Sequence, residues 1–160
     1  MVNSQTLYEK LKSSLGVFER RTPFSEHMAV PKSEPMPVVI VFGLGRYGGR
    51  LMQRLQNQGV NTLGVDFDPE AVRRSLLCGL NARFGDAEDA ELPASLPLAE
   101  ARWALSILHD TGINRALIAA LREHGYTGQI AVAAQSEKDI HVLKKAGADP
   151  EVSPQSCNAG

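Results

Sequence analysis

Few cysteines, balanced charge and short apolar runs exclude several classes of protein. The 160 residues contain two cysteines, Cys78 and Cys157. They form no CxxC motif and have no histidine at a metal-ligand spacing, so neither a disulfide framework nor a zinc site is expected. A reducing, cytoplasmic environment is therefore the default interpretation.

The charges nearly cancel, because 17 basic residues stand against 18 acidic ones and the formal net charge is −1. No bulk attraction to nucleic acid or to anionic lipid is expected. The apolar runs, such as residues 38–42, are far too short to cross a bilayer. The first residues are polar and lack the apolar segment of a secretory signal. With 43% hydrophobic residues, the composition is typical of an ordinary globular domain.

The first 21 residues predict an amphipathic helix. Apolar side chains recur at spacings of four, four and three, at Leu7, Leu11, Leu15 and Phe18. Two interpretations stay open. The helix packs on its own domain or on a second copy of the chain, or it is a connector whose apolar face belongs against a partner outside this chain.

The predicted organisation has four parts. Residues 1–21 form the connector helix, and residues 22–37 form a linker with four prolines and little chance of regular structure. Residues 38–153 form the globular domain, and residues 154–160 form a tail.

Apolar strands and amphipathic helices alternate throughout that domain. Strands are expected at residues 38–42, 62–66, 81–84, 102–108 and 129–134, with a possible sixth at 149–153. Helices are expected at residues 46–58, 69–77, 111–124 and 136–146, and only a helical turn or two near Pro93 and Pro97. This order predicts an α/β fold with a Rossmann-like, doubly wound parallel sheet of five to six strands.

The main motif is a GxGxxG loop between the first strand and the first helix of this domain. It reads Gly43-Leu44-Gly45-Arg46-Tyr47-Gly48. Gly43 permits a tight turn, Gly45 lets a pyrophosphate approach the backbone, and Gly48 lets the helix pack closely on the strand. The helix amino terminus favours phosphate, and Arg46 adds a charge-assisted contact. The alternative is a structural turn without a ligand.

Asp66 is the second signal, because it ends the second strand 23 residues after Gly43. A carboxylate there accepts hydrogen bonds from the ribose hydroxyls and repels a 2′-phosphate, so NADP is disfavoured. The alternative is a strand-end turn residue. Asp68, followed by Pro69, is more typical of a helix cap than of a ligand contact.

Further candidates follow the third and fourth strands, where ligands bind in such sheets. Asp86 is placed to accept a hydrogen bond from an adenine amino group, or is an ordinary loop acid. His109 is a poor candidate for acid–base catalysis, because a lone histidine is more often structural. Thr111 and Asn114 either line the same edge or begin a helix.

No catalytic constellation emerges from the sequence. It holds no Walker lysine, HExxH motif or supported Ser/His/Asp arrangement. We therefore predict a binding protein and not an enzyme. The main alternative is a fragment of an NAD-dependent oxidoreductase, although residues 1–36 are too few to build the usual substrate domain. A methyltransferase fits less well, and a structural module with a degenerate site would bind no nucleotide.

The sequence resembles the RCK amino-terminal (TrkA-N) domain, which regulates potassium transport proteins. Three motifs carry the resemblance, in this order: the glycine loop, the stretch 65–70 and Gly85-Asp86-Ala87. The similarity covers residues 37–150 and is strongest to the cytoplasmic tails of Kef-type antiporters of the monovalent cation:proton antiporter-2 family. Residues 7–21 resemble the segment that follows the last transmembrane helix of such antiporters. Two departures are Glu88, often threonine in the family, and residues 133–136, which lack a common arginine.

The resemblance implies binding of NAD(H) or AMP, with ADP or ATP possible, and nucleotide control of potassium or sodium transport. It also implies a homodimer, a transmembrane antiporter or channel partner, and a place at the cytoplasmic face of the membrane. Phosphate would contact the glycine loop, ribose Asp66 and adenine Asp86. The complete candidate set is Gly43, Leu44, Gly45, Arg46, Tyr47, Gly48, Asp66, Phe67, Asp68, Gly85, Asp86, Ala87, Leu108 and His109.

Overall fold

The computed structural model describes residues 38–149, which contain one sheet of five parallel strands. The strands are β1 (Val39–Phe42), β2 (Thr62–Asp66), β3 (Ala82–Phe84), β4 (Trp103–Ser106) and β5 (Gln129–Val132). Their spatial order is β3-β2-β1-β4-β5, so the chain builds outward from β1 and then crosses to its other side. The expectations for residues 1–37 and for the tail at 154–160 lie outside the described residues.

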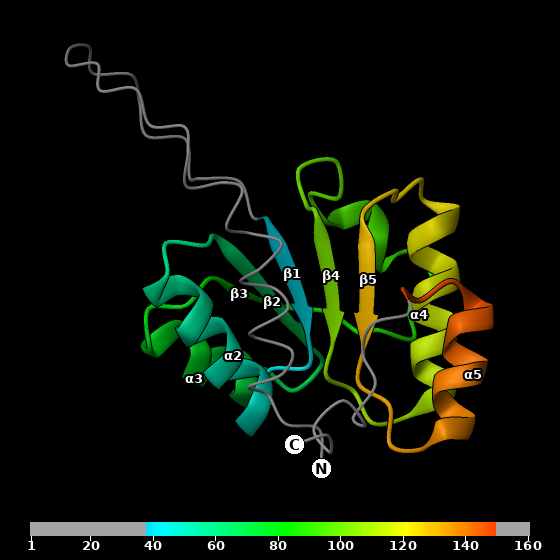
Figure 1. Cartoon of the computed structure of the whole chain (residues 1–160). Helices are drawn as coiled ribbons and strands as arrows, with labels where there is room; N and C mark the ends of the chain where they lie inside the picture. The colour runs from blue at the N-terminus through cyan, green and yellow to red at the C-terminus, as the bar shows by residue number, and fades with distance from the viewer. Residues whose placement is uncertain (1–37, 150–160) are drawn as a thin grey trace.

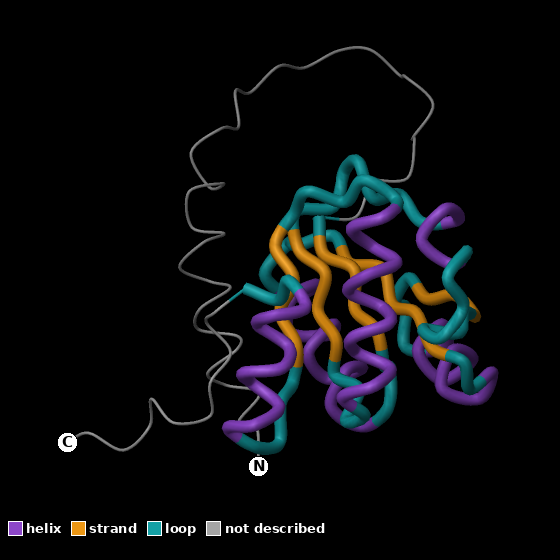
Figure 2. The backbone as a smooth tube through the Cα atoms, turned by 90° about the vertical axis from the view of Figure 1, so that its right-hand side faces the viewer, coloured by secondary structure: helices purple, strands orange, loops and turns teal. Residues whose placement is uncertain are grey.

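Helices cover both faces of this sheet (Figure 1). The helical elements are α2 (Arg46–Asn57), α3 (Pro69–Leu77), the short 3-10 helix η2 (Leu92–Ser95), α4 (Thr111–Glu123) and α5 (Glu137–Ala146). One face packs against α2 and α3, and the other packs against α4, α5 and η2. In Figure 2 the helices run alongside the strands. The predicted doubly wound parallel sheet is confirmed.

The continuous apolar run of β1 reflects burial on both faces of the sheet. Ile40 and Phe42 belong to the core cluster under α4 and α5, whereas Val39 and Val41 belong to the cluster under α2 and α3. All four side chains are 0–1% exposed. A central parallel strand needs apolar side chains at every position, because successive side chains point to opposite, equally buried faces.

Side chains cap the amino termini of three of the four α-helices within residues 38–149. The Asp68 side chain accepts a hydrogen bond from the Glu70 amide, so the predicted cap is confirmed. Asp110 and Ser136 cap α4 and α5 in the same way. Helix α2 differs, because Gly45 occupies its N-cap position and no side chain satisfies its first amides.

The observed boundaries agree with the expected ones to within two residues. Strand β4 ends at Ser106, two residues early, because the chain turns there and the Leu108 amide donates to Ser106 Oγ at 3.4 Å. Strand β5 likewise ends at Val132, two residues before the expected end. The short 3-10 helix η2 agrees with the turn or two expected near Pro93.

Only the first residue of the possible sixth strand is described. The Asp149 amide donates to Ile130 O at 2.9 Å, and Asp149 Oδ2 accepts from the Ile130 amide at 2.7 Å. Asp149 therefore pairs with the outer edge of β5, and the continuation at 150–153 stays a prediction.

Candidate nucleotide-binding site

The fold requires two of the three glycines in the loop between β1 and α2. Gly43 has a φ of +92°, a conformation that other residues rarely adopt. A Cβ atom on Gly48 would lie 1.8 Å from the Gly43 carbonyl oxygen, so only glycine fits there. A Cβ on Gly45 would meet nothing within 4 Å. The fold therefore accounts for Gly43 and Gly48, whereas the space beside Gly45 is free for a ligand.

The amino terminus of α2 opens into the same space. Its first turn holds no acidic residue, and Gly45 provides no side-chain cap. Arg46 and Tyr47 are exposed there, Tyr47 to 48%, while Leu44 is buried in the core beneath. Unpaired amides and a nearby guanidinium make this end of the helix suitable for an anionic group such as phosphate.

Asp66 lies at the carboxyl end of β2, next to the loop. Its Oδ2 accepts a hydrogen bond from the Leu44 amide at 2.5 Å, and its Oδ1 accepts one from the Asp68 amide at 2.9 Å. The residue is half-buried. An ionised carboxylate has about four acceptor positions, so two remain for ribose hydroxyls. Asp68 itself is the cap of α3, and its Oδ2 lies 3.8 Å from Arg74.

The Gly85-Asp86-Ala87 segment follows β3 at the same edge of the sheet. Gly85 is buried, and a Cβ there would lie 2.6 Å from Leu92 Cδ1 and 2.8 Å from Val65 Cγ1. Asp86 is exposed and its Oδ1 accepts a hydrogen bond from the Glu88 amide at 2.9 Å. Gly85 thus serves packing, and Asp86 stabilises its own turn with acceptor positions left over.

Two phenylalanines project from this edge. Phe67 follows Asp66 and is 64% exposed, and Phe84 is the register partner of Asp66 on β3 and is 63% exposed. Phe84 was absent from the sequence candidates, because a three-residue strand is too short to show which of its faces is solvated. The signal available was an aromatic residue two positions before the candidate acid.

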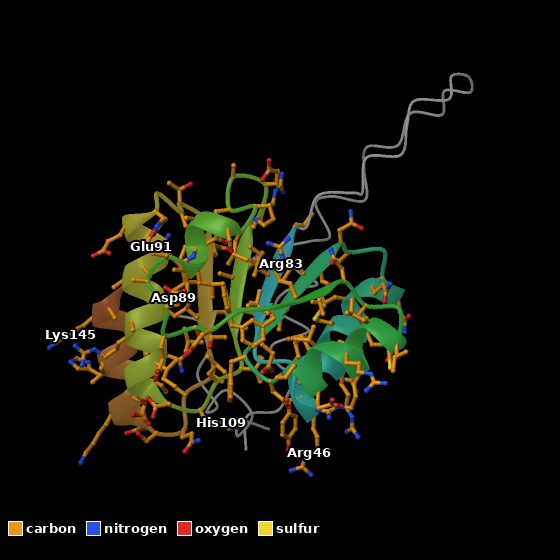
Figure 3. The ribbon with its side chains drawn as sticks, turned by 180° about the vertical axis from the view of Figure 1, so that it is seen from behind. Arg46, Arg83, Asp89, Glu91, His109 and Lys145 are labelled. Atoms are coloured by element: carbon orange, nitrogen blue, oxygen red, sulfur yellow. The ribbon has the colours of Figure 1, made fainter. Side chains whose placement is uncertain are left out.

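The β4–α4 connection forms the other side of the site. Leu108 is half-buried, and its Cδ2 lies 3.1 Å from the position of a Cβ on Gly43. His109 is exposed, and Figure 3 shows it at the same end of the molecule as Arg46. Of the two alternatives for Thr111 and Asn114, the structure shows that they begin a helix, because α4 starts at Thr111. The Asn114 side chain is 1% exposed and lies in the core, so it does not line this edge.

A cavity lies away from the glycine loop. It has a volume of about 590 Å³ and lies at the opposite edge of the sheet, lined by residues near the starts of β4 and β5 such as Trp103, His124 and Gln129. Within residues 38–149, no three His, Cys, Asp or Glu side chains are grouped as metal ligands. The same part of the chain has no helix long and apolar enough to span a membrane.

A family model decides the assignment, because the model of the TrkA-N domain matches residues 39–154. The chain belongs to the TrkA-N domain family. The glycine loop, Asp66 and the Gly85-Asp86-Ala87 segment all lie inside this TrkA-N domain.

One curated relative is a potassium-efflux protein. A glutathione-regulated potassium-efflux system protein KefC from Escherichia fergusonii is 29% identical over 116 residues, which cover 72% of this chain and 19% of that protein. The chain thus spans 19% of the length of that curated relative.

Solved structures share the fold. The NAD(P)-binding domain of an exopolyphosphatase-related protein from Archaeoglobus fulgidus has a TM-score of 0.65 at 26% identity, covering 71% of this chain and 84% of that one. The Shewanella denitrificans Kef CTD in its AMP-bound form has a TM-score of 0.56 at 17% identity, covering 70% and 67%.

Proposed function

We propose that this TrkA-N domain is the nucleotide-sensing regulatory domain of a potassium (or sodium):proton antiporter or related potassium transport system. The observation that carries the proposal is the free space at Gly45, beside an α2 amino terminus that no side chain caps. Asp66 stands next to it with acceptor positions left for a ribose. The similarity to a potassium-efflux protein and to an AMP-bound Kef domain supports the same function.

The proposed ligand is NAD(H) or AMP. The amides of the glycine loop and the Arg46 guanidinium would bind phosphate, and Asp66 would accept hydrogen bonds from the ribose. The base would lie toward Phe67 and Asp86, with Leu108 and His109 on the opposite wall. The negative charge of Asp66 would repel a 2′-phosphate, which disfavours NADP.

The ligand acts through a difference in affinity between two arrangements of the protein. A nucleotide that binds one arrangement more tightly shifts the equilibrium toward it, and only that difference transmits a signal. In the proposal the chain forms a homodimer at the cytoplasmic face of the membrane, and residues 1–36 couple it to the transmembrane partner. Deleting residues 1–36 from the parent transporter should abolish nucleotide control of ion flux.

The test is calorimetric titration of the 160-residue chain with NAD⁺, NADH, AMP and ATP, with Asp66→Ala as the control. Binding by the wild type that the variant loses is expected, and the ranking of the four nucleotides separates redox sensing from energy sensing. Failure of all four to bind would refute the sensor. Consumption of NADH with small carbonyl compounds would instead favour an oxidoreductase.

A further inference from the structure

A pair of hydrogen-bonded polar side chains is buried beneath the candidate site. Ser106, the last residue of β4, is 2% exposed, and Asn114, in the second turn of α4, is 1% exposed. Ser106 Oγ donates to Asn114 Oδ1 at 2.6 Å. Burying two polar side chains is unfavourable unless they are paired, so their presence needs an explanation.

Both side chains hold the backbone of one residue, Leu108. Asn114 Nδ2 donates to the Leu108 carbonyl oxygen at 3.0 Å, and the Leu108 amide donates to Ser106 Oγ at 3.4 Å. The donor and the acceptor of this one peptide position are therefore both bound to the buried pair. The pair thereby fixes the path of the chain between β4 and α4.

Leu108 in turn lies beside the glycine loop. Its Cδ2 lies 3.1 Å from the position that a Cβ on Gly43 would occupy, and the neighbouring Ile107 amide donates to the Phe42 carbonyl oxygen at 2.9 Å. Gly43 has a positive φ, so the turn into the phosphate-binding part of the loop depends on this residue. If Leu108 were displaced, the turn at Gly43 would lose the side chain that lies beside it.

We propose that Ser106 and Asn114 are positioning residues for nucleotide binding. They keep Leu108 against Gly43, so that the glycine loop holds its ligand-binding shape before the nucleotide arrives. Binding then costs less ordering of the loop, which raises affinity without any contact between these two residues and the ligand. The inference rests on the proposed nucleotide site. Ser106 and Asn114 would act on that site through Leu108, without touching the nucleotide.

The test uses Ser106→Ala and Asn114→Ala in the 160-residue chain. Ser75→Ala is the matched control, because Ser75 is also buried, at 5% exposure, but lies in α3. Two quantities are measured: the affinity for AMP and NADH by calorimetry, and the backbone amide resonances of Gly43 to Gly45 in the ligand-free protein. Ser106→Thr, which keeps the hydroxyl, tests for rescue.

We expect both variants to weaken nucleotide binding about tenfold and to shift the loop resonances. Ser75→Ala should change neither, and Ser106→Thr should restore most of the affinity. Wild-type affinity together with unchanged loop resonances in Ser106→Ala would overturn the proposal. If the wild type binds neither nucleotide, the proposed function fails, and the resonances alone still decide whether the pair positions the loop.

Discussion

The carboxylate of Asp66 binds the backbone of Leu44, the second residue of the glycine loop. Leu44 donates its amide hydrogen to Asp66 Oδ2 at 2.5 Å, across 22 positions of the chain. The other oxygen accepts from the Asp68 amide at 2.9 Å. The acid that we propose for ribose binding therefore also ties the end of β2 to the loop between β1 and α2.

Asp66→Asn and Asp66→Ala should distinguish the proposed ribose contact of Asp66 from its hydrogen bond to the Leu44 amide. The asparagine keeps an oxygen that can accept from the Leu44 amide, whereas alanine leaves that amide without its partner. We expect Asp66→Ala to lower the free energy of unfolding by about 1–3 kcal/mol and to abolish nucleotide binding. Asp66→Asn should unfold closer to the wild type, bind NAD(H) more weakly, and reject NADPH less strongly because the negative charge is gone.

Urea unfolding and calorimetric titration of both variants measure these effects. Equal stability of Asp66→Ala and the wild type would contradict the tie between Asp66 and the loop. Unchanged nucleotide affinity in both variants would contradict the ribose contact.

Gly48→Ala should lower folding stability, whereas Gly45→Ala should lower nucleotide affinity. A methyl group on Gly48 would collide with the Gly43 carbonyl oxygen, so we expect a loss of at least about 2 kcal/mol of folding stability. A methyl group on Gly45 meets nothing in the protein, so the melting temperature should stay near that of the wild type while nucleotide affinity falls at least tenfold. Thermal unfolding beside titration provides the measurement, and a Gly45→Ala protein that still binds tightly would count against phosphate at this position.

Tyr126 should make the domain sensitive to alkali. Burial raises the pKa of the Tyr126 phenol far above its ordinary value, Arg122 opposes the shift, and Asp149 adds to it. Because the folded state holds the neutral phenol, its contribution is complete below about pH 10 and is lost as the pH rises further. We expect Tyr126→Phe to lose less stability than the wild type as the pH rises above about 10 in urea unfolding.

The exposed Tyr47→Phe is the matched control for that experiment, since it removes the same hydroxyl from the surface. Identical alkaline losses in Tyr126→Phe and the wild type would show that the buried phenol does not govern the effect.

Asp139 should stabilise the folded protein at pH values where its carboxyl group is ionised. Hydrogen bonds from Ser136 Oγ at 2.6 Å and Thr111 Oγ1 at 2.9 Å lower the pKa of this carboxyl group. A lowered folded pKa gives stability that is present above about pH 3.9 and is lost as the pH falls toward the folded value. We expect Thr111→Val to raise the pKa of Asp139, as followed by carboxyl-carbon NMR during an acid titration.

The exposed Thr127→Val is the comparison variant, because it makes the same change away from Asp139. A pKa of Asp139 that is the same in Thr111→Val and in the wild type would rule out a contribution from the α4–α5 hydrogen bond.

Much of the domain was predictable because its local signals agree with one another. The apolar run of β1, the cap at Asp68 and the glycine loop before α2 each predict the element that the structure shows. Strand ends were less predictable, since β4 stops at Ser106 through a side-chain hydrogen bond to Leu108 that no periodicity reveals. The exposure of Phe84 and the burial of Asn114 were likewise not evident from the sequence.

The sequence by itself determined the alternation of strands and helices, the family, and the order of the glycine loop, Asp66 and Asp86. These follow from periodicity, caps and glycine spacing, which act over a few residues. Tertiary structure alone decided that Asp66 holds Leu44, that Leu108 lies against Gly43, and that Ser106 and Asn114 share one buried hydrogen bond. The parallel sheet brings Asp66 to Leu44 and Leu108 to Gly43, because it gathers the carboxyl ends of β1, β2 and β4 at one edge.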